Sequence, residues 1–138
     1  MTARQALAEL MRPHIAAILD RVSDEACLAG DQTQLPSIAD LRFVLERGAE
    51  RGVRAIALPA DARRAELRAL ADASRAALDG LSVPAIARIG LSRMGMRQAR
   101  AAVERAARGR ADAATLLQEL ALFEEDLVEA LQAALLVA

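Results

Sequence analysis

The sequence predicts an all-α fold: a single-domain bundle of five or six helices over residues 1–138, ending in a long amphipathic helix. Alanine and leucine, which favour helices, supply most of the 54% of residues that are hydrophobic. Aromatic residues, which favour strands, are limited to Phe43 and Phe123. Apolar residues also recur with helical spacing along most of the chain. At 138 residues the chain is long enough to bury a core of its own.

The first helix is expected over about residues 2–29. Thr2 and Gln5 have the spacing of a capping box, which predicts where this helix begins. Pro13 interrupts the pattern and either kinks the helix or starts a second segment, because proline has no backbone N–H to donate. The polar stretch 31–36 ends in proline and predicts a loop.

A second helix is expected after Ser37, which has the properties of an N-cap and is followed by Asp40 three positions later. This helix is expected to stop near Gly48 or Gly52. Residues 53–58 alternate like a strand, but a lone strand has no partner in an otherwise helical chain. They are therefore expected to form an extended linker or an extension of the helix.

Asp61 is expected to cap a third helix that runs through Leu78, with Gly80 just beyond its end. A short apolar segment, 84–89, then precedes a glycine and a basic helix over 93–108, which ends at the next glycine.

The order of elements across residues 61–108 resembles a tri-helical helix-turn-helix core, in which a glycine turn joins two helices. Ala87 and Gly90 would form that turn, although two residues separate them where three are usual. In this interpretation, residues 84–108 bind DNA, and phosphates or base edges meet a row of arginines consisting of Arg93, Arg97, Arg100 and Arg108. The alternative is that this row is a solvated face, or pairs with the acidic helix that follows.

The charges of the C-terminal part are sorted into two blocks. Residues 83–110 contain seven arginines and one glutamate, a net charge of +6, whereas residues 111–138 contain six acids and no base, a net charge of −6. Such a division can be neutralised between helices inside the fold or used on an acidic partner such as DNA. The sequence leaves both possibilities open.

The last helix is expected over residues 112–136, with one wide apolar face. The candidate interaction residues on this face are Leu116, Leu120, Phe123, Leu127, Leu131 and Leu135. The face can close the bundle within the chain, or it can pack on a second copy in an isologous interface. The sequence does not decide between them.

Glu124 is the exception on this face, since it lies among leucines where a carboxylate would lose its hydration. It therefore predicts an ion pair, most simply with an arginine of the basic helix. The alternative is a position at the rim, from which the carboxylate reaches solvent.

No constellation of residues predicts catalysis, a metal site or a cofactor. His14 is the only histidine and Cys27 the only cysteine, so neither a histidine pair for a metal nor an intrachain disulfide can form. We interpret His14 as a structural residue and Cys27 as part of the core. No signal-peptide pattern or membrane-spanning run occurs, which favours a cytoplasmic protein with no membrane partner.

Two functional hypotheses follow. The first is a non-catalytic helical adaptor or assembly subunit, which binds a protein partner or a second copy as a homo-oligomer. The alternative is a small DNA-binding regulator that uses residues 84–108 as a helix-turn-helix and the last helix as dimeriser. All 18 basic residues are arginine, which is typical of a GC-rich genome, but the net charge of −1 gives no overall basic character.

Overall fold

The computed structural model describes residues 1–29, 38–81, 83 and 85–136. In this part of the chain it is entirely helical, without strands, so the all-α prediction is confirmed. The elements are α1 (Ala3–Met11), the 3-10 turn η1 (Arg12–His14), α2 (Ile15–Ala29), α3 (Ile38–Ile56), α4 (Ala60–Gly80), α5 (Ala85–Ala107) and α6 (Ala113–Leu136).

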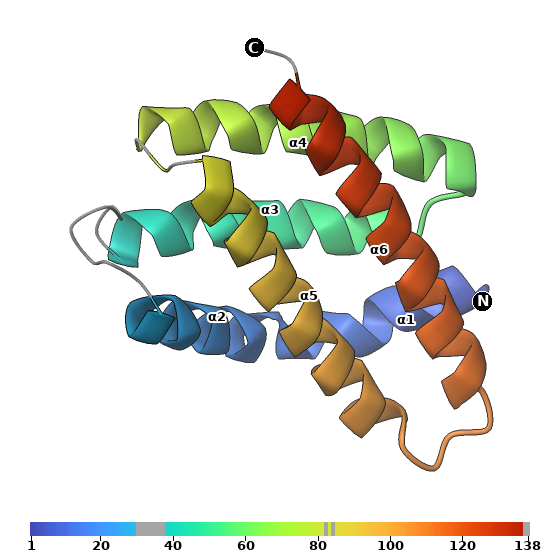
Figure 1. Cartoon of the computed structure of the whole chain (residues 1–138). Coiled ribbons are helices and arrows are strands. Elements are labelled where there is room, and N and C mark those ends of the chain that lie inside the picture. Colours follow the sequence, from blue (N-terminus) through green and yellow to red (C-terminus); the bar gives the residue numbers. More distant parts are fainter. Residues whose placement is uncertain (30–37, 82, 84, 137–138) are drawn as a thin grey trace.

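The helices form two layers (Figure 1). In one layer, α4, α3 and the rod made by α1 and α2 lie side by side. In the other, α5 and α6 run antiparallel to each other and cross the first layer diagonally. α6 contacts α4 and α1, while α5 contacts α2 and α1, so the last two helices cover a single face of the three-rod layer. The other face of that layer is left uncovered by the described helices.

The core lies between the two layers. Its largest fully buried side chains come from helices throughout the chain: Leu7, Ile56, Leu67, Val103, Leu116 and Leu120. Alanines such as Ala8, Ala55 and Ala99 are buried among them. Small side chains let helices approach closely, which explains how a chain with only two aromatic residues packs its core. Val83, between α4 and α5, is buried in a second, smaller cluster with Val22, Leu78 and Leu91.

The first predicted helix is divided at the proline. Thr2 and Gln5 form the predicted capping box, with Gln5 N–H donating to Thr2 Oγ1 at 3.2 Å and Thr2 N–H donating to Gln5 Oε1 at 2.9 Å. Pro13 lies in η1, between α1 and α2, where the backbone tightens instead of continuing as an α-helix. The predicted loop over 31–36 and the cap at Ser37 lie outside the described residues.

The prediction that the second helix stops near Gly48 or Gly52 is wrong, because α3 continues through both to Ile56. Neither glycine has a positive φ, so neither ends the helix as a C-terminal glycine would. Gly52 is buried against α4 and α6: a Cβ at this position would lie 3.8 Å from the Phe123 ring and 4.0 Å from a Leu70 methyl. Up to Ile56, the strand-like segment 53–58 is therefore a helix extension, one of the two expected outcomes.

Replacing Gly52 with alanine is expected to stabilise the protein by about 1 kcal/mol, because alanine favours the helix and its methyl group fits at ordinary contact distance. Gly109→Ala is the matched control. Gly109 has φ +83° and no crowding, so alanine there is expected to destabilise by about 1 kcal/mol through backbone strain alone. Urea denaturation of the two variants should give shifts of opposite sign; a destabilised Gly52→Ala variant would contradict the packing around Gly52.

The boundaries of α4 differ from the prediction at both ends. The N-cap is Pro59, which makes no side-chain cap, and Asp61 lies inside the first turn instead of capping it. There its carboxylate faces the positive end of the helix dipole, which favours a helix start without a side-chain cap. Gly80 is the last residue of α4 rather than the residue beyond it, and Leu81 is the C-cap.

The helix-turn-helix expected within residues 84–108 does not form in the described part of this range. α5 is one continuous helix from Ala85 to Ala107, and Gly90 lies inside it. A Cβ at Gly90 would meet nothing within 4 Å, so this glycine does not bring two helices together. Ser92 Oγ donates to the carbonyl of Arg88, four residues earlier, at 3.1 Å, which satisfies its hydroxyl within the helix.

Gly109 does end α5 as predicted, and α6 begins at Ala113, one residue after the predicted start. Between them, Arg110 donates to Asp112 at 2.9 Å, and this hydrogen bond lowers the pKa of the Asp112 carboxyl. The loop is therefore a short, charge-paired connection between two antiparallel helices.

Two arginines of α4 attach it to α6. Arg63 is buried and donates from Nε to Asp126 Oδ2 at 2.9 Å, with Nη2 at 2.8 Å from the same oxygen. Arg75 donates to the carbonyl of Ala134 at 3.1 Å. Loss of the Arg63–Asp126 pair should destabilise the fold more than loss of the Arg75 hydrogen bond, because it would leave a buried guanidinium without a compensating charge.

Candidate functional site

The apolar face of α6 belongs largely to the core of its own chain. Leu116, Leu120 and Phe123 are buried, and Leu127 and Leu131 are partly buried against the same core cluster. The side chain of Leu135 lies outside the described part of the structure. Leu116, Leu120 and Phe123 are therefore not available to a partner, because α1, α3 and α4 already fill the space that they face.

Glu124 pairs with the basic helix, as its position among leucines suggested. Arg100 Nη2 donates to Glu124 Oε2 at 3.0 Å, which joins α5 to α6. The carboxylate also keeps 33% of its exposure, so it lies at the rim of the apolar face rather than beneath it. Both expected features are present together: an arginine partner and access to solvent.

The four arginines predicted as a basic patch on α5 divide into two groups. Arg97 donates to Glu25 of α2 at 2.6 Å, and Arg100 donates to Glu124. Arg93 and Arg108 are exposed and form no ion pair with another described residue. The basic block is thus neutralised in part inside the fold.

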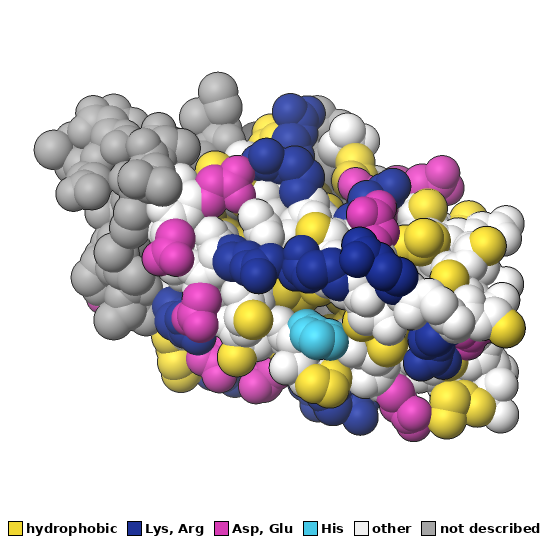
Figure 2. Space-filling model, turned by 90° about the horizontal axis from the view of Figure 1, so that it is seen from below, with side chains coloured by type: hydrophobic (Ala, Val, Ile, Leu, Met, Phe, Trp, Pro, Cys, Tyr) yellow, Lys and Arg dark blue, Asp and Glu magenta, His cyan; other side chains and the backbone are white. Residues whose placement is uncertain are grey.

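Both signs of charge share the surface around α1, α2 and α5. Basic side chains form a row across the face shown in Figure 2, and acidic side chains lie around that row. The basic row is therefore flanked by negative charge, unlike the broad basic face that binds a nucleic-acid backbone.

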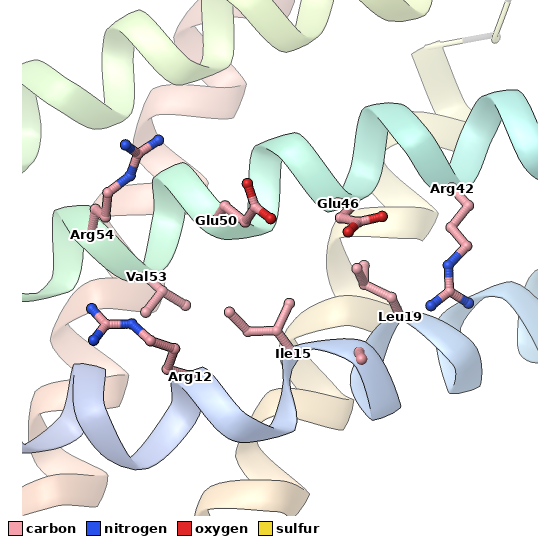
Figure 3. Close-up of a pocket in the computed structure, with 9 residues that line it drawn as sticks. Arg12, Ile15, Leu19, Arg42, Glu46, Glu50, Val53 and Arg54 are labelled. Carbon is pink, nitrogen blue, oxygen red and sulfur yellow. The ribbon is translucent and has the colours of Figure 1, made fainter.

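A groove that the sequence analysis did not identify lies between α2 and α3 (Figure 3). Its volume is about 520 Å³, and it opens on the side of the three-rod layer away from α5 and α6, which pass behind it in the close-up. Ile15 and Leu19 of α2 and Val53 of α3 form an apolar floor. The small side chain of Ala16 also lines the groove on the α2 side. The break at Pro13 places α2 as a separate segment, so that Ile15 and Leu19, four residues apart, both face α3.

The α3 side of the groove is a row of charges at four-residue intervals, namely Arg42, Glu46, Glu50 and Arg54. This spacing places one side chain above the next along a helix. The four-residue spacing of these charges is visible in the sequence and is the feature that could have indicated a groove beside this helix. By itself, however, it did not show which helix would lie opposite.

The two ends of the groove differ in charge balance. At one end, Arg42 donates to Asp20 of α2, and this hydrogen bond raises the pKa of the Arg42 guanidinium. At the other end, Arg12 and Arg54 are exposed and form no ion pair with another described residue. One end is thus closed by an internal pair, while the other presents two guanidinium groups to solvent.

Other candidate chemistry is sparse in the described residues. No three His, Cys, Asp or Glu side chains among them lie close enough together to hold a metal ion. His14 is partly buried in η1, and the side chain of Cys27 lies outside the described part. In the portion searched, no helix has the length and apolar character that crossing a membrane requires.

The protein is thus a helical bundle with a groove whose apolar floor is flanked by charged side chains. Comparison with family models, with curated proteins and with solved structures gives no match.

Proposed function

We propose that this protein is a non-catalytic helical interaction subunit that holds a segment of a partner protein in the groove between α2 and α3. The observation that supports this function best is the groove itself, in which an apolar floor lies open between charged rims. Recognition surfaces in proteins combine these two features, since apolar contact supplies affinity and the surrounding charges supply specificity.

The shape of the groove favours an amphipathic helix as the bound segment. From Arg42 to Arg54 the α3 rim spans twelve residues, which corresponds to about 18 Å or three helical turns. A partner helix can place apolar side chains at i, i+3 and i+4 on Ile15, Leu19 and Val53. Its acidic residues would then lie at the end where Arg12 and Arg54 form no ion pair with another described residue.

Site-specific photo-crosslinking tests this proposal in the cells that make the protein. A photoreactive amino acid at Ala16, which is exposed on the groove wall, is expected to give one adduct of defined mass. The matched control is the same amino acid at Ala69, an exposed position on α4. Arg54→Glu should reduce the Ala16 adduct several-fold, because it reverses a charge at the unpaired end.

An adduct from Ala16 but not from Ala69 supports the groove as the partner site. The same adducts from both positions, or none from Ala16, would show that the groove does not hold a partner.

A further inference from the structure

We propose that a second copy of this chain docks on the outer surface of α5 and α6, with α5 of each copy lying on α6 of the other. This surface is on the opposite side of the molecule from the α2–α3 groove, so the inference does not depend on the proposed partner site (Figures 1 and 3). It also differs from the dimer expected from the leucine face of α6, since that face is used in the core.

The outer surface carries two parallel rows of opposite charge. The α5 row contains Arg93, Arg97, Arg100 and Arg108, with a single acid, Glu104, among them. Arg97 and Arg100 keep 66% and 50% of their exposure despite their internal pairs, so their remaining N–H donors are free to bind. The α6 row contains Glu125 and Glu129, which are both exposed and form no ion pair with another described residue. Glu129 lies on the α4 side of this row, where it borders a small hollow together with Arg64 and Arg68.

The Arg100–Glu124 contact fixes the register of the two rows. The helices are antiparallel and rise equally per residue, so each step back along α5 matches a step forward along α6. Glu125 is therefore level with the interval between Arg97 and Arg100. Glu129 is level with the interval between Arg93 and Arg97.

This register selects one symmetry for the dimer. A two-fold axis that runs along the helices, between α5 and α6, lays the α5 row of one copy on the α6 row of the other at the same level. Each glutamate of the row then meets two arginines of the second copy, and symmetry repeats the contact. A two-fold axis across the helices would instead lay α5 on α5, where like charges repel.

Apolar residues on the same surface support a protein partner. Leu122 and Val128 of α6 are large hydrophobic residues with 41% and 42% exposure. In the proposed dimer they would pack on the aliphatic stems of the arginines from the second copy. DNA fits this surface less well, because Glu104, Glu125 and Glu129 would repel its phosphates.

Sedimentation velocity on the full chain tests the proposal. The wild-type protein is expected to form a dimer whose affinity falls as salt rises, because its charges are exposed. Arg93→Glu/Arg97→Glu and Glu125→Arg/Glu129→Arg should each weaken dimerisation about ten-fold or more, since each places like charges opposite each other. The control is Arg21→Glu/Arg47→Glu, which makes the same charge change at exposed positions on α2 and α3 and should leave dimerisation unchanged.

An equimolar mixture of the two interface variants gives the sharper result. In a mixed dimer both α5–α6 contacts pair opposite charges again, so the mixture should dimerise although neither variant does so alone. Restoration also shows that both variants are folded. A wild-type monomer at every concentration, variants that dimerise like the wild type, or a mixture that stays monomeric would each overturn the proposal. So would a monomer that shifts duplex DNA in gels through Arg93 and Arg97.

Discussion

Leu120→Ala is expected to lower the free energy of unfolding by about 3 kcal/mol, one of the largest effects available in this chain. Leu120 is only 1% exposed in the core beneath α6, and alanine would leave a cavity that rigid neighbouring helices fill poorly. The control is Phe43→Ala on α3, outside the proposed dimer surface, where the side chain is 60% exposed and its loss should cost less than about 1 kcal/mol. Urea denaturation measures both values.

The same measurement at two protein concentrations separates a core from an interface. If Leu120 is in the core of its own chain, the loss is the same at both concentrations. A loss that shrinks or disappears on dilution would mean that Leu120 contributes to an interface between chains, contrary to the structure.

Asp126→Ala is the second change with a large expected effect. It would leave the buried Arg63 guanidinium without its carboxylate, which is expected to cost about 3 kcal/mol or more. The double variant Arg63→Met/Asp126→Leu removes both charges and should recover most of that loss, since two apolar side chains pack without a desolvation cost.

An exposed pair provides the control for this experiment. Asp112→Ala breaks the Arg110 pair in the loop before α6, where both side chains are 43% exposed, and should change stability by less than about 1 kcal/mol. Equal losses for Asp126→Ala and Asp112→Ala would contradict the burial of Arg63.

The elements with strong local signals could be predicted from the sequence. The capping box at Thr2, the break at Pro13 and the stop at Gly109 each depend on the chemistry of one or two neighbouring residues. Local chemistry of this kind operates before tertiary packing and is readable without it. The start of α6 lies within one residue of the prediction, which rested on the apolar periodicity of this helix.

Glycines inside helices could not be assigned from the sequence. A glycine ends a helix when it adopts a positive φ, as Gly109 does. Gly52 and Gly90 remain helical, and the residue type alone does not distinguish them from Gly109. At Gly52 the surrounding Leu70 and Phe123 make up for its low helix propensity. The predicted helix-turn-helix failed because it depended on reading Gly90 as a turn.

The groove between α2 and α3 needed the tertiary structure. Its lining comes from two segments on either side of residues 30–37, and the sequence did not show that Ile15 and Leu19 would face Val53. The division of charge between α5 and α6 is visible in the sequence, but the sequence does not show which of these charges pair within the fold. The structure shows that Arg97 and Arg100 are paired internally, whereas Arg93 and Arg108 form no ion pair with the other described residues.

Isotope-filtered NMR tests most directly whether the apolar face of α6 is the core of its own chain. The chain has two phenylalanines, so the Phe123 ring signals have to be told apart only from those of Phe43 and of the His14 imidazole, and a Phe43→Leu variant assigns them. In a sample mixed from labelled and unlabelled chains, its contact with Gly52, which lies beside the Phe123 ring, should appear only within a chain. Contacts of the Phe123 ring that pass between labelled and unlabelled chains would contradict the structure described above.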